Sequence, residues 1–456
     1  MSPRTRALPP LPLIHLSEPT RPAIPAWKII LPVLGAAALG WWGYSWVTRP
    51  VNPPLDPAAR QGSVAGDWAT LKTFGPRTPG TPGHDRTLDW AQAHLTALGY
   101  HVTRDTFPLD VWTDGGATVT GPGGLNVTGR ALYGSQGFDQ QGRLVAVPGD
   151  ASDAQLEALD LQMQLAVTHC PERPWGRFAA ALIDRGAFGV AIIDDCPVTP
   201  ALSRAPATPL PMLVLDREAG AALETHLGQT VTFTTRTGEQ TVQAANLVAR
   251  RVEGQAQVIY GAHLDSVPGA SGANDNASGV LAVLDLARRA AGTPDAKRAW
   301  FALFDAEELG LIGSRQFVRT YAYPMEQTRA MINLDMVGVG AQPLGVAATE
   351  DLLPLIRAAR PGLREFEDEA QSTRETFGRS LGTTGLSDHA AFKEVRIPAA
   401  FLHRGLDGHY HTPQDTTLDP ALVQDAARTA WTLGQAVLAA PFTPRPECGL
   451  TGRDCH

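Results

Sequence analysis

The chain has 456 residues, of which 43% are hydrophobic, and this length favours two lobes, or one domain with a large insertion, over a single compact domain. The formal net charge is -8 and no long run of lysine or arginine occurs. These features argue against a nucleic-acid-binding protein, which usually presents a basic face.

Residues 29–47 contain no charged side chain and carry three tryptophans near their far end. Such a run is long enough to cross a bilayer as a helix. Basic residues are more numerous before it than after it, which predicts a cytoplasmic segment 1–28 and a catalytic domain outside the cytoplasm. No small-residue cleavage site follows, so we expect an uncleaved single-pass membrane anchor rather than a removed signal peptide. The alternative, a buried helix of a soluble domain, fits poorly with the proline-rich flanks.

Prolines in residues 48–57 predict an extended linker, and folded sequence is expected from about Ala58. A helix should follow, because Leu88, Ala91, Leu95 and Leu98 share one face and Gly99 is a natural C-terminal stop.

Residues 111–242 have a different pattern, with short candidate strands at 144–147, 190–193 and 212–215 and a helix at 178–187. No cluster of His, Asp and Glu occurs there. We interpret the segment as a lobe inserted into a catalytic domain that comprises residues 58–110 and 243–440. The alternative is that it continues the main sheet.

The cysteines are spaced too widely for a zinc ribbon. In an oxidising compartment the spacing favours two local disulfides, Cys170 with Cys196, and Cys448 with Cys455 in the tail 441–456. Four unrelated thiols are the alternative.

After Asn246 the pattern of strand, polar loop and helix repeats. The expected strands are residues 258–262, 300–304, 330–334 and 399–402, and the expected helices are 278–290, capped by Ser278, 313–321 and a final one within 420–440. This alternation predicts an α/β fold, a mainly parallel mixed sheet with helices on both faces.

Metal-type side chains follow the ends of these strands. In open parallel sheets ligands bind outside the carboxyl ends of the strands, so these side chains should meet at one edge. They are His263, Asp275, Glu307, Glu308, Asp335 and His411. Imidazole and carboxylate groups suit zinc.

The number of donors indicates two metals. One catalytic zinc needs three protein ligands, whereas five candidates remain when Glu307 is set aside. If Asp275 bridges, two metals each receive three protein ligands, and Glu307 can act as a base. Taken alone, Asp275 could form an Asx turn, and Glu307 and Glu308 could be ordinary residues of a first helical turn.

Other carboxylates are expected to support the ligands. Asp265, two residues from His263, is more plausible as a hydrogen-bond partner that fixes an imidazole than as a ligand. Asp388 and Asp415 could play similar parts, with turn capping as the alternative. His84 and His389 are left unassigned.

Six segments together resemble the dizinc aminopeptidase family that includes aminopeptidase S and aminopeptidase Y, with glutamate carboxypeptidase II and glutaminyl cyclase as more distant relatives. They read "HLDS", "GANDNASG", "FDAEELGLIGS", "NLDMVG", "SDHAAF" and "HYHTPQDT". The similarity covers residues 246–419 closely and "GPRTPGTPGHDRT" more loosely. It implies the zinc exopeptidase fold.

The resemblance implies that His263 and Asp335 complete one zinc site, that Glu308 and His411 complete the other, and that Asp275 bridges them. Glu307 would be the general base towards a water shared by the two metals, and the Asp275–Asn276 peptide bond is a candidate for the cis form. The "HTPQD" context selects His411 over two neighbouring histidines, of which His409 is better placed to touch substrate. The substrate would be the N-terminus of a peptide or protein.

The lobe resembles a protease-associated domain, in segments such as "GRLVAVPG". Three other functions remain open: a glutaminyl-peptide cyclase, a hydrolase of the aminoacylase and carboxypeptidase G type, and a non-catalytic receptor-like binding protein. The presence of all six expected residues disfavours the last. Side-chain specificity and oligomeric state are not predicted.

Overall fold

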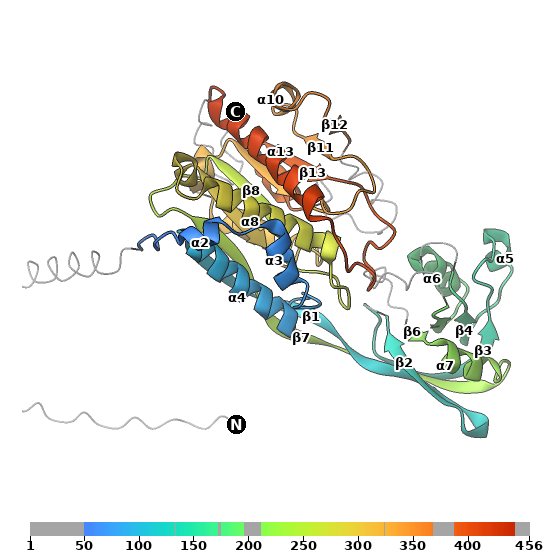
Figure 1. Cartoon of the computed structure of the whole chain (residues 1–456). Coiled ribbons are helices and arrows are strands. Elements are labelled where there is room, and N and C mark those ends of the chain that lie inside the picture. Colours follow the sequence, from blue (N-terminus) through green and yellow to red (C-terminus); the bar gives the residue numbers. More distant parts are fainter. Residues whose placement is uncertain are drawn as a thin grey trace, which may run out of the picture. The chain divides into compact units, whose positions relative to one another are not determined.

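The computed structural model describes residues 50–132, 134–171, 175–195, 211–322, 324–367 and 387–442 (Figure 1). The predicted anchor, Cys196, Cys448 and Cys455 lie outside these ranges. Within them, no helix combines the length and the apolar character needed to span a membrane. Cys170 is disulfide-bonded.

The described strands form one mixed sheet. The part that the sequence predicts to be the catalytic domain, called the catalytic part, contains the strands β8 (Val258–His263), β9 (Ala299–Phe304), β10 (Ala330–Leu334), β11 (Gly345–Ala348), β12 (Arg364–Glu365) and β13 (Ala399–His403). Strands β9, β8, β10 and β13 are neighbours in that order and run parallel. Their carboxyl ends therefore lie at one edge, as the sequence predicts.

Alternate side chains of these strands pack on opposite faces of the sheet. Val258 and Tyr260 of β8 belong to one buried cluster, whereas Ile259 between them belongs to another. In the same way, Phe301 and Phe304 of β9 face opposite sides. Both faces are therefore apolar, which explains why these strands appear in the sequence as continuous hydrophobic runs.

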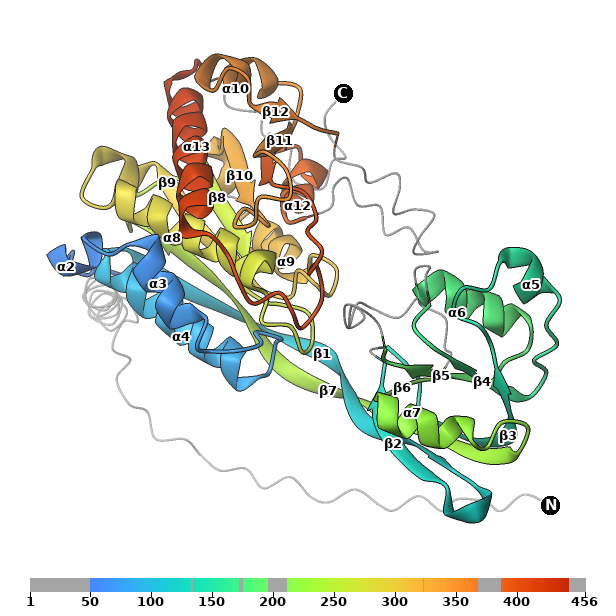
Figure 2. The same cartoon turned by 45° about the vertical axis from the view of Figure 1, so that its right-hand side comes forward.

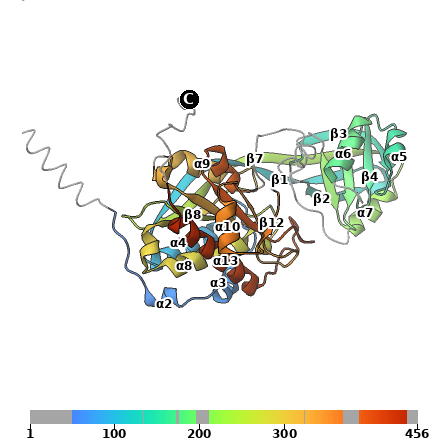
Figure 3. The same ribbon diagram turned by 90° about the horizontal axis from the view of Figure 1, so that it is seen from above.

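Helices cover both faces of the catalytic part. One face carries α3 (Val64–Leu71), α4 (Pro82–Ala97), α8 (Ser278–Ala290) and α13 (Pro420–Ala439). The other face carries α9 (Ile312–Thr320) and α12 (His389–Glu394). Figures 2 and 3 show α9 on one side of the strands and α4 and α8 on the other. Two further α-helices of this part that the structure describes are the short α2 (Pro57–Arg60) and α10 (Leu353–Ala359).

Two long strands lead from the catalytic part into the lobe. They are β1 (His101–Thr120) and β7 (Thr230–Arg250), which pair antiparallel along most of their length. β7 also pairs with β9 and with β3, so one ladder of hydrogen bonds joins the two sets of strands. The predicted lobe boundaries, 111 and 242, fall within these strands.

The lobe has its own buried clusters. Its strands are β2 (Asn126–Ala131), β3 (Phe138–Ala146), β4 (Gln164–Thr168), β5 (Gly189–Ile193) and β6 (Met212–Leu215), and its helices are α5 (Asp153–Glu157), α6 (Trp175–Asp184) and α7 (Arg217–Glu224). Phe178 of α6 packs in one cluster and Leu223 of α7 in the other. The two helices accordingly lie on opposite faces of the lobe strands (Figure 2).

Most predicted elements agree with the structure to within a residue or two, and α4 buries the expected face. The strand predicted at 144–147 begins earlier, as β3, and the helix predicted at 178–187 begins and ends three residues earlier, as α6. The capping role predicted for Ser278 is wrong. Ala277 is the N-cap residue, and the Ser278 hydroxyl donates to the Asn274 carbonyl and accepts the N–H of Val337. Folded contacts also begin before Ala58, because Asn52 bonds the backbone N–H of Val252.

Candidate metal centre

The loops after the parallel strands bring the predicted metal-type residues together. His263 ends β8, and its Nε2 atom lies 3.2 Å from Asp275 Oδ1 and 3.4 Å from Asp335 Oδ1. Asp275 belongs to the turn η2 (Ala273–Ala277) before α8, and Asp335 follows β10. Three segments that are distant in sequence thus meet at one point.

A second histidine approaches the same aspartate from the other side. His411 Nε2 lies 3.2 Å from Asp275 Oδ2 and 3.1 Å from Glu308 Oε2. Glu307 belongs to a group with His263 and Asp335 in which the donor atoms lie within 4.8 Å of one another. The two oxygens of Asp275 therefore face different histidines, and each histidine has a further carboxylate beside it.

The donor set fits zinc. His263, Asp275 and Asp335 are at most 8% exposed, and no hydrogen bond reaches Glu308 Oε1 or Asp335 Oδ1 in the described part of the chain. Buried carboxylate oxygens without a donor are costly unless a cation compensates them. Nitrogen and oxygen donors of this kind suit zinc.

Asp265 holds the loop that carries the two glutamates. Its Oδ1 accepts the N–H of Glu307 at 3.1 Å, and its Oδ2 accepts the N–H of Glu308 at 3.3 Å. Its Oδ1 also lies 3.5 Å from His263 Nδ1. One buried carboxylate thus holds the backbone of both glutamates and lies beside the imidazole.

The backbone around Asp275 is fixed by Asp415, whose two oxygens accept the N–H groups of Asn274 and Asp275 at 2.8 and 3.0 Å. The Asp275–Asn276 bond is cis, so that prediction is confirmed. Gly272 has φ +62, and a Cβ there would lie 2.2 Å from the Asp275 carbonyl oxygen. Only glycine fits this turn.

Asp335 is oriented by polar groups behind it. Ser387 Oγ donates to Asp335 Oδ2 at 2.7 Å and accepts Asn333 Nδ2 at 2.8 Å. His403 Nδ1 lies 2.9 Å from the Asp335 carbonyl oxygen. His403 therefore contacts the backbone of the site, whereas His411 enters the cluster.

Burial dominates the protonation of the acidic residues. It raises the pKa of Glu307 well above its usual range, and the charges of Glu308 and Asp388 add to this, although His263 opposes it. Burial together with the charge of Asp275 raises the pKa of Glu308 to about 7. Asp275 behaves differently, because hydrogen bonds from His263 and His411 outweigh burial and hold its pKa below the usual range.

The histidines show the reverse balance. Burial lowers the pKa of His263, but the charges of Asp335 and Glu307 outweigh it and place this pKa well above the usual value. Glu308 and Asp275 do the same for His411. A cluster that retains protons in this way has a strong need for positive charge, which metal ions would supply in their place.

Several site residues were not predicted from the sequence. Tyr410 stacks on His411 with ring centroids 3.7 Å apart. Arg77 is 2% exposed, and its guanidinium donates to the carbonyls of Leu264, Ser271 and Gly272. Arg77 lies in the loosely matching segment "GPRTPGTPGHDRT", which was the only signal available for it.

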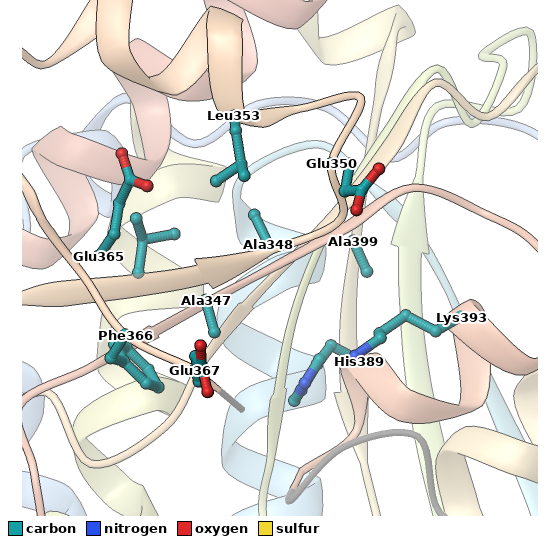
Figure 4. Close-up of a pocket in the computed structure, with 11 residues that line it drawn as sticks. Ala347, Ala348, Glu350, Leu353, Glu365, Phe366, Glu367, His389, Lys393 and Ala399 are labelled. Atoms are coloured by element: carbon teal, nitrogen blue, oxygen red, sulfur yellow. The ribbon is translucent and has the colours of Figure 1, made fainter. Parts of the chain in front are cut away.

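A cavity of about 580 Å³ lies along β11 and α12. It is lined by Val346, Ala347, Ala348, Glu350, Leu353, Glu365, Phe366, Glu367, His389, Lys393 and Ala399. Phe366 and His389 lie at one end and Leu353 at the other (Figure 4). His389 stacks on Phe401 with ring centroids 4.7 Å apart. The preceding residue, Asp388, is buried, and burial raises its pKa to about 7.

Comparison with known proteins finds a family model that matches part of the chain. Residues 246–434 match the model described as Peptidase family M28. The chain is 29% identical over 354 residues to the probable lipoprotein aminopeptidase LpqL of Mycobacterium tuberculosis, covering 73% of this chain and 70% of that protein. It is 25% identical over 358 residues to aminopeptidase YwaD of Bacillus subtilis, covering 76% of this chain and 77% of that protein.

A solved structure shares the fold. It is titled "The structure of BSAP, a zinc aminopeptidase from Bacillus subtilis", with a TM-score of 0.63 and 24% identity, covering 82% of this chain and 94% of the other. The match extends over most of the chain and so includes more than the segment of the family model.

Proposed function

We propose that this chain is a metallopeptidase of family M28, an aminopeptidase that removes N-terminal residues from peptides with the help of two zinc ions. The observation that carries the proposal is the position of His263 and His411 on opposite oxygens of Asp275. The names of the related proteins, aminopeptidase in two cases and zinc aminopeptidase in the third, support it.

The residues divide between two ion positions. His263 and Asp335 would hold one zinc, Glu308 and His411 the other, and Asp275 would contribute one oxygen to each. When bound, the zinc ions supply Lewis-acid activation of a water and of the scissile carbonyl. Asp265, Asp415 and Ser387 would keep these donors in place through the hydrogen bonds described above.

Glu307 is the residue best placed to move the proton. It is near His263 and Asp335, and Asp265 holds its backbone N–H. A carboxylate in this position would take a proton from the attacking water and pass it to the leaving amine. Burial raises the pKa of Glu307 above its usual range, which favours its return of the proton as an acid.

The location proposed for the enzyme is outside the cytoplasm, with residues 29–47 as a membrane anchor and residues 111–242 as a protease-associated-like lobe. The disulfide bond of Cys170 supports an oxidising compartment. The name lipoprotein aminopeptidase given to the mycobacterial relative also supports an extracytoplasmic enzyme at a membrane. The lobe would influence access of larger peptides.

The test is an assay of purified enzyme on aminoacyl amides with leucine, lysine or arginine at the N-terminus, with an N-acetylated amide as the matched control. The proposal predicts release of the N-terminal residue, loss of activity on exhaustive chelation, and recovery with zinc. Hydrolysis of the acetylated control at an equal rate would contradict an aminopeptidase. Formation of pyroglutamate from an N-terminal glutamine would indicate a cyclase instead.

A further inference from the structure

A buried histidine–aspartate pair lies next to the glutamate loop and has no part in the function proposed above. His84 is in the first turn of α4, and its Nε2 atom lies 2.8 Å from Asp305 Oδ2. Both side chains are fully buried. Asp305 follows β9 and precedes Glu307 by two residues. A buried pair of this kind is expensive to keep unless it has a structural or functional role.

The Asp305 carboxylate joins three separate segments. Besides His84, its Oδ2 accepts the N–H of Ala245 in β7 at 2.6 Å. Its Oδ1 accepts the N–H of Ala306 at 2.9 Å. The N–H of Asp305 in turn donates to Asn246 Oδ1 at 3.0 Å. The side chain therefore ties the start of the glutamate loop to α4 and to β7.

The loop needs such support because its backbone is unusual. Ala306 has φ +55, in the left-handed region that residues with a Cβ rarely adopt. Such conformations persist where the surroundings hold them. Asp305 holds Ala306 on one side, and Asp265 holds the N–H of Glu307 on the other. The proposed base therefore lies between two buried aspartates.

Close packing prevents Asp305 and His84 from shifting together. A Cβ on Gly313 would lie 2.1 Å from the Asp305 carbonyl oxygen, and a Cβ on Gly83 would lie 2.1 Å from the Pro76 carbonyl oxygen. The backbones on both sides of the pair are thus in direct contact with their neighbours. A change in the hydrogen bond between His84 and Asp305 would be passed to Ala306 rather than absorbed elsewhere.

We infer that His84 and Asp305 are positioning residues for Glu307, with His84 fixing the Asp305 carboxylate and Asp305 fixing the backbone from which the Glu307 side chain projects. The inference rests on the proposed function, in that it takes Glu307 to be the base. It assigns a role to the histidine of "GPRTPGTPGHDRT". Misplacement of a catalytic group by about 1 Å can lower a rate by about 100-fold.

The test compares three variants. His84→Leu removes the donor to Asp305, and His84→Gln keeps an N–H donor of similar reach. His94→Leu is the matched control, because His94 lies on the same helix and its side chain is 13% exposed. Its charged neighbours, Asp67 at 3.8 Å and Arg288 at 3.1 Å, belong to α3 and α8. For each variant kcat, KM, bound zinc and thermal midpoint are measured on the full-length protein.

The expected result is a roughly 10- to 100-fold fall in kcat for His84→Leu, with KM and bound zinc unchanged. His84→Gln should stay within about threefold of the parent, and His94→Leu should lose only thermal stability. Amide hydrogen exchange in the metal-free protein adds a readout that does not depend on activity. Residues 305–312 should exchange faster in His84→Leu than in His94→Leu.

An unchanged kcat in metal-loaded His84→Leu, or an equal loss in His94→Leu, would overturn the inference. If His84→Leu does not fold, Asp305→Asn replaces it. The NH2 group of the asparagine would then face at least one of the three N–H donors, His84, Ala245 or Ala306. A Glu307→Gln arm separates the two proposals. Full turnover in that variant would refute the base role of Glu307, whereas the exchange comparison would still decide whether His84 and Asp305 hold the loop.

Discussion

Asp275 Oδ2 lies 3.2 Å from His411 Nε2, so the turn before α8 and the loop after β13 meet at one carboxylate. The other oxygen, Oδ1, is at the same distance from His263 Nε2. A carboxylate between two imidazoles fits the bridging role proposed for Asp275.

Replacing Asp275 by Ala should abolish binding of both metal ions, because each would lose a ligand that no neighbour can supply. Bound zinc in the purified variant, measured by elemental analysis, should fall to well below one ion per chain. Asp150→Ala is the control, since that residue is exposed and lies in the lobe. Retention of a full complement of zinc in Asp275→Ala would contradict the bridging role.

Replacing Glu307 by Gln should lower kcat by about 100- to 10,000-fold, because the amide cannot accept the proton from water. Bound zinc should not change, since Glu307 is not among the proposed ligands. Steady-state kinetics on a leucyl amide, together with metal analysis of the same sample, provides the check. A variant that is inactive only because it has lost zinc would count against the assignment.

Replacing Ser387 by Ala should weaken zinc binding by about 10- to 100-fold, the usual effect of losing a group that orients a ligand. The hydroxyl donates to Asp335 Oδ2 and accepts Asn333 Nδ2. Competition with a chelator of known affinity measures the change. Thr320→Ala, in an exposed helix end, is a suitable control, and equal affinities in the two variants would argue against a role for Ser387.

The metal-free protein should become less stable as the pH rises from about 5 to about 7.5. Burial raises the pKa of Glu308 to about 7, of Asp388 to about 7 and of Asp415 to about 6. The folded state then keeps protons that the unfolded chain loses above its ordinary carboxyl pKa of about 4, so the stability present below that pKa is lost towards pH 7.

Two other groups do not reverse this trend. The raised pKa of His263 adds a loss at higher pH, and the lowered pKa of Asp275 acts only below about pH 4. Thermal midpoints of chelator-treated protein at several pH values provide the test, and Asp388→Asn should reduce the slope. A thermal midpoint that rises between about pH 5 and about pH 7.5 would show that the buried carboxyl groups do not retain protons in the folded, metal-free protein.

A fragment that begins at Pro50 should be more stable than one that begins at Ala58, by about 1 to 3 kcal/mol. The shorter fragment lacks Asn52, which bonds the N–H of Val252 at 2.8 Å, and the Asp56 cap of α2. It also lacks the bond from the Asp56 N–H to the Ala97 carbonyl. Chemical denaturation of both fragments measures the difference, and equal midpoints would mean that these contacts are not formed in solution.

The sequence predicts the parallel centre of the sheet well, because β8, β9 and β10 are buried on both faces and appear as apolar runs. It does not predict β1 and β7. Over about twenty residues, buried side chains in these strands are interrupted by exposed and charged ones, and Pro108 lies inside β1. In the sequence such a pattern resembles turns and short strands. In the fold, β1 and β7 are continuous because they pair with each other.

The predicted ligands come together in space because each lies in a loop after a parallel strand, and these loops meet at one edge of the sheet. The position of a residue after a strand can be seen in the sequence. The supporting groups follow no such rule. Arg77, Asp305 and Ser387 act through backbone atoms or through residues remote in sequence, so their roles depend on packing that a motif does not encode. Asp265 was predicted to orient His263, but its hydrogen bonds to Glu307 and Glu308 appear only in the fold.

Titration of the metal-free enzyme with zinc, with activity followed at each addition, tests the central proposal most directly. If five residues hold two ions around Asp275, activity should rise until two zinc ions are bound per chain and then remain constant. Full activity at one zinc per chain, or turnover that survives exhaustive removal of metal, would contradict it.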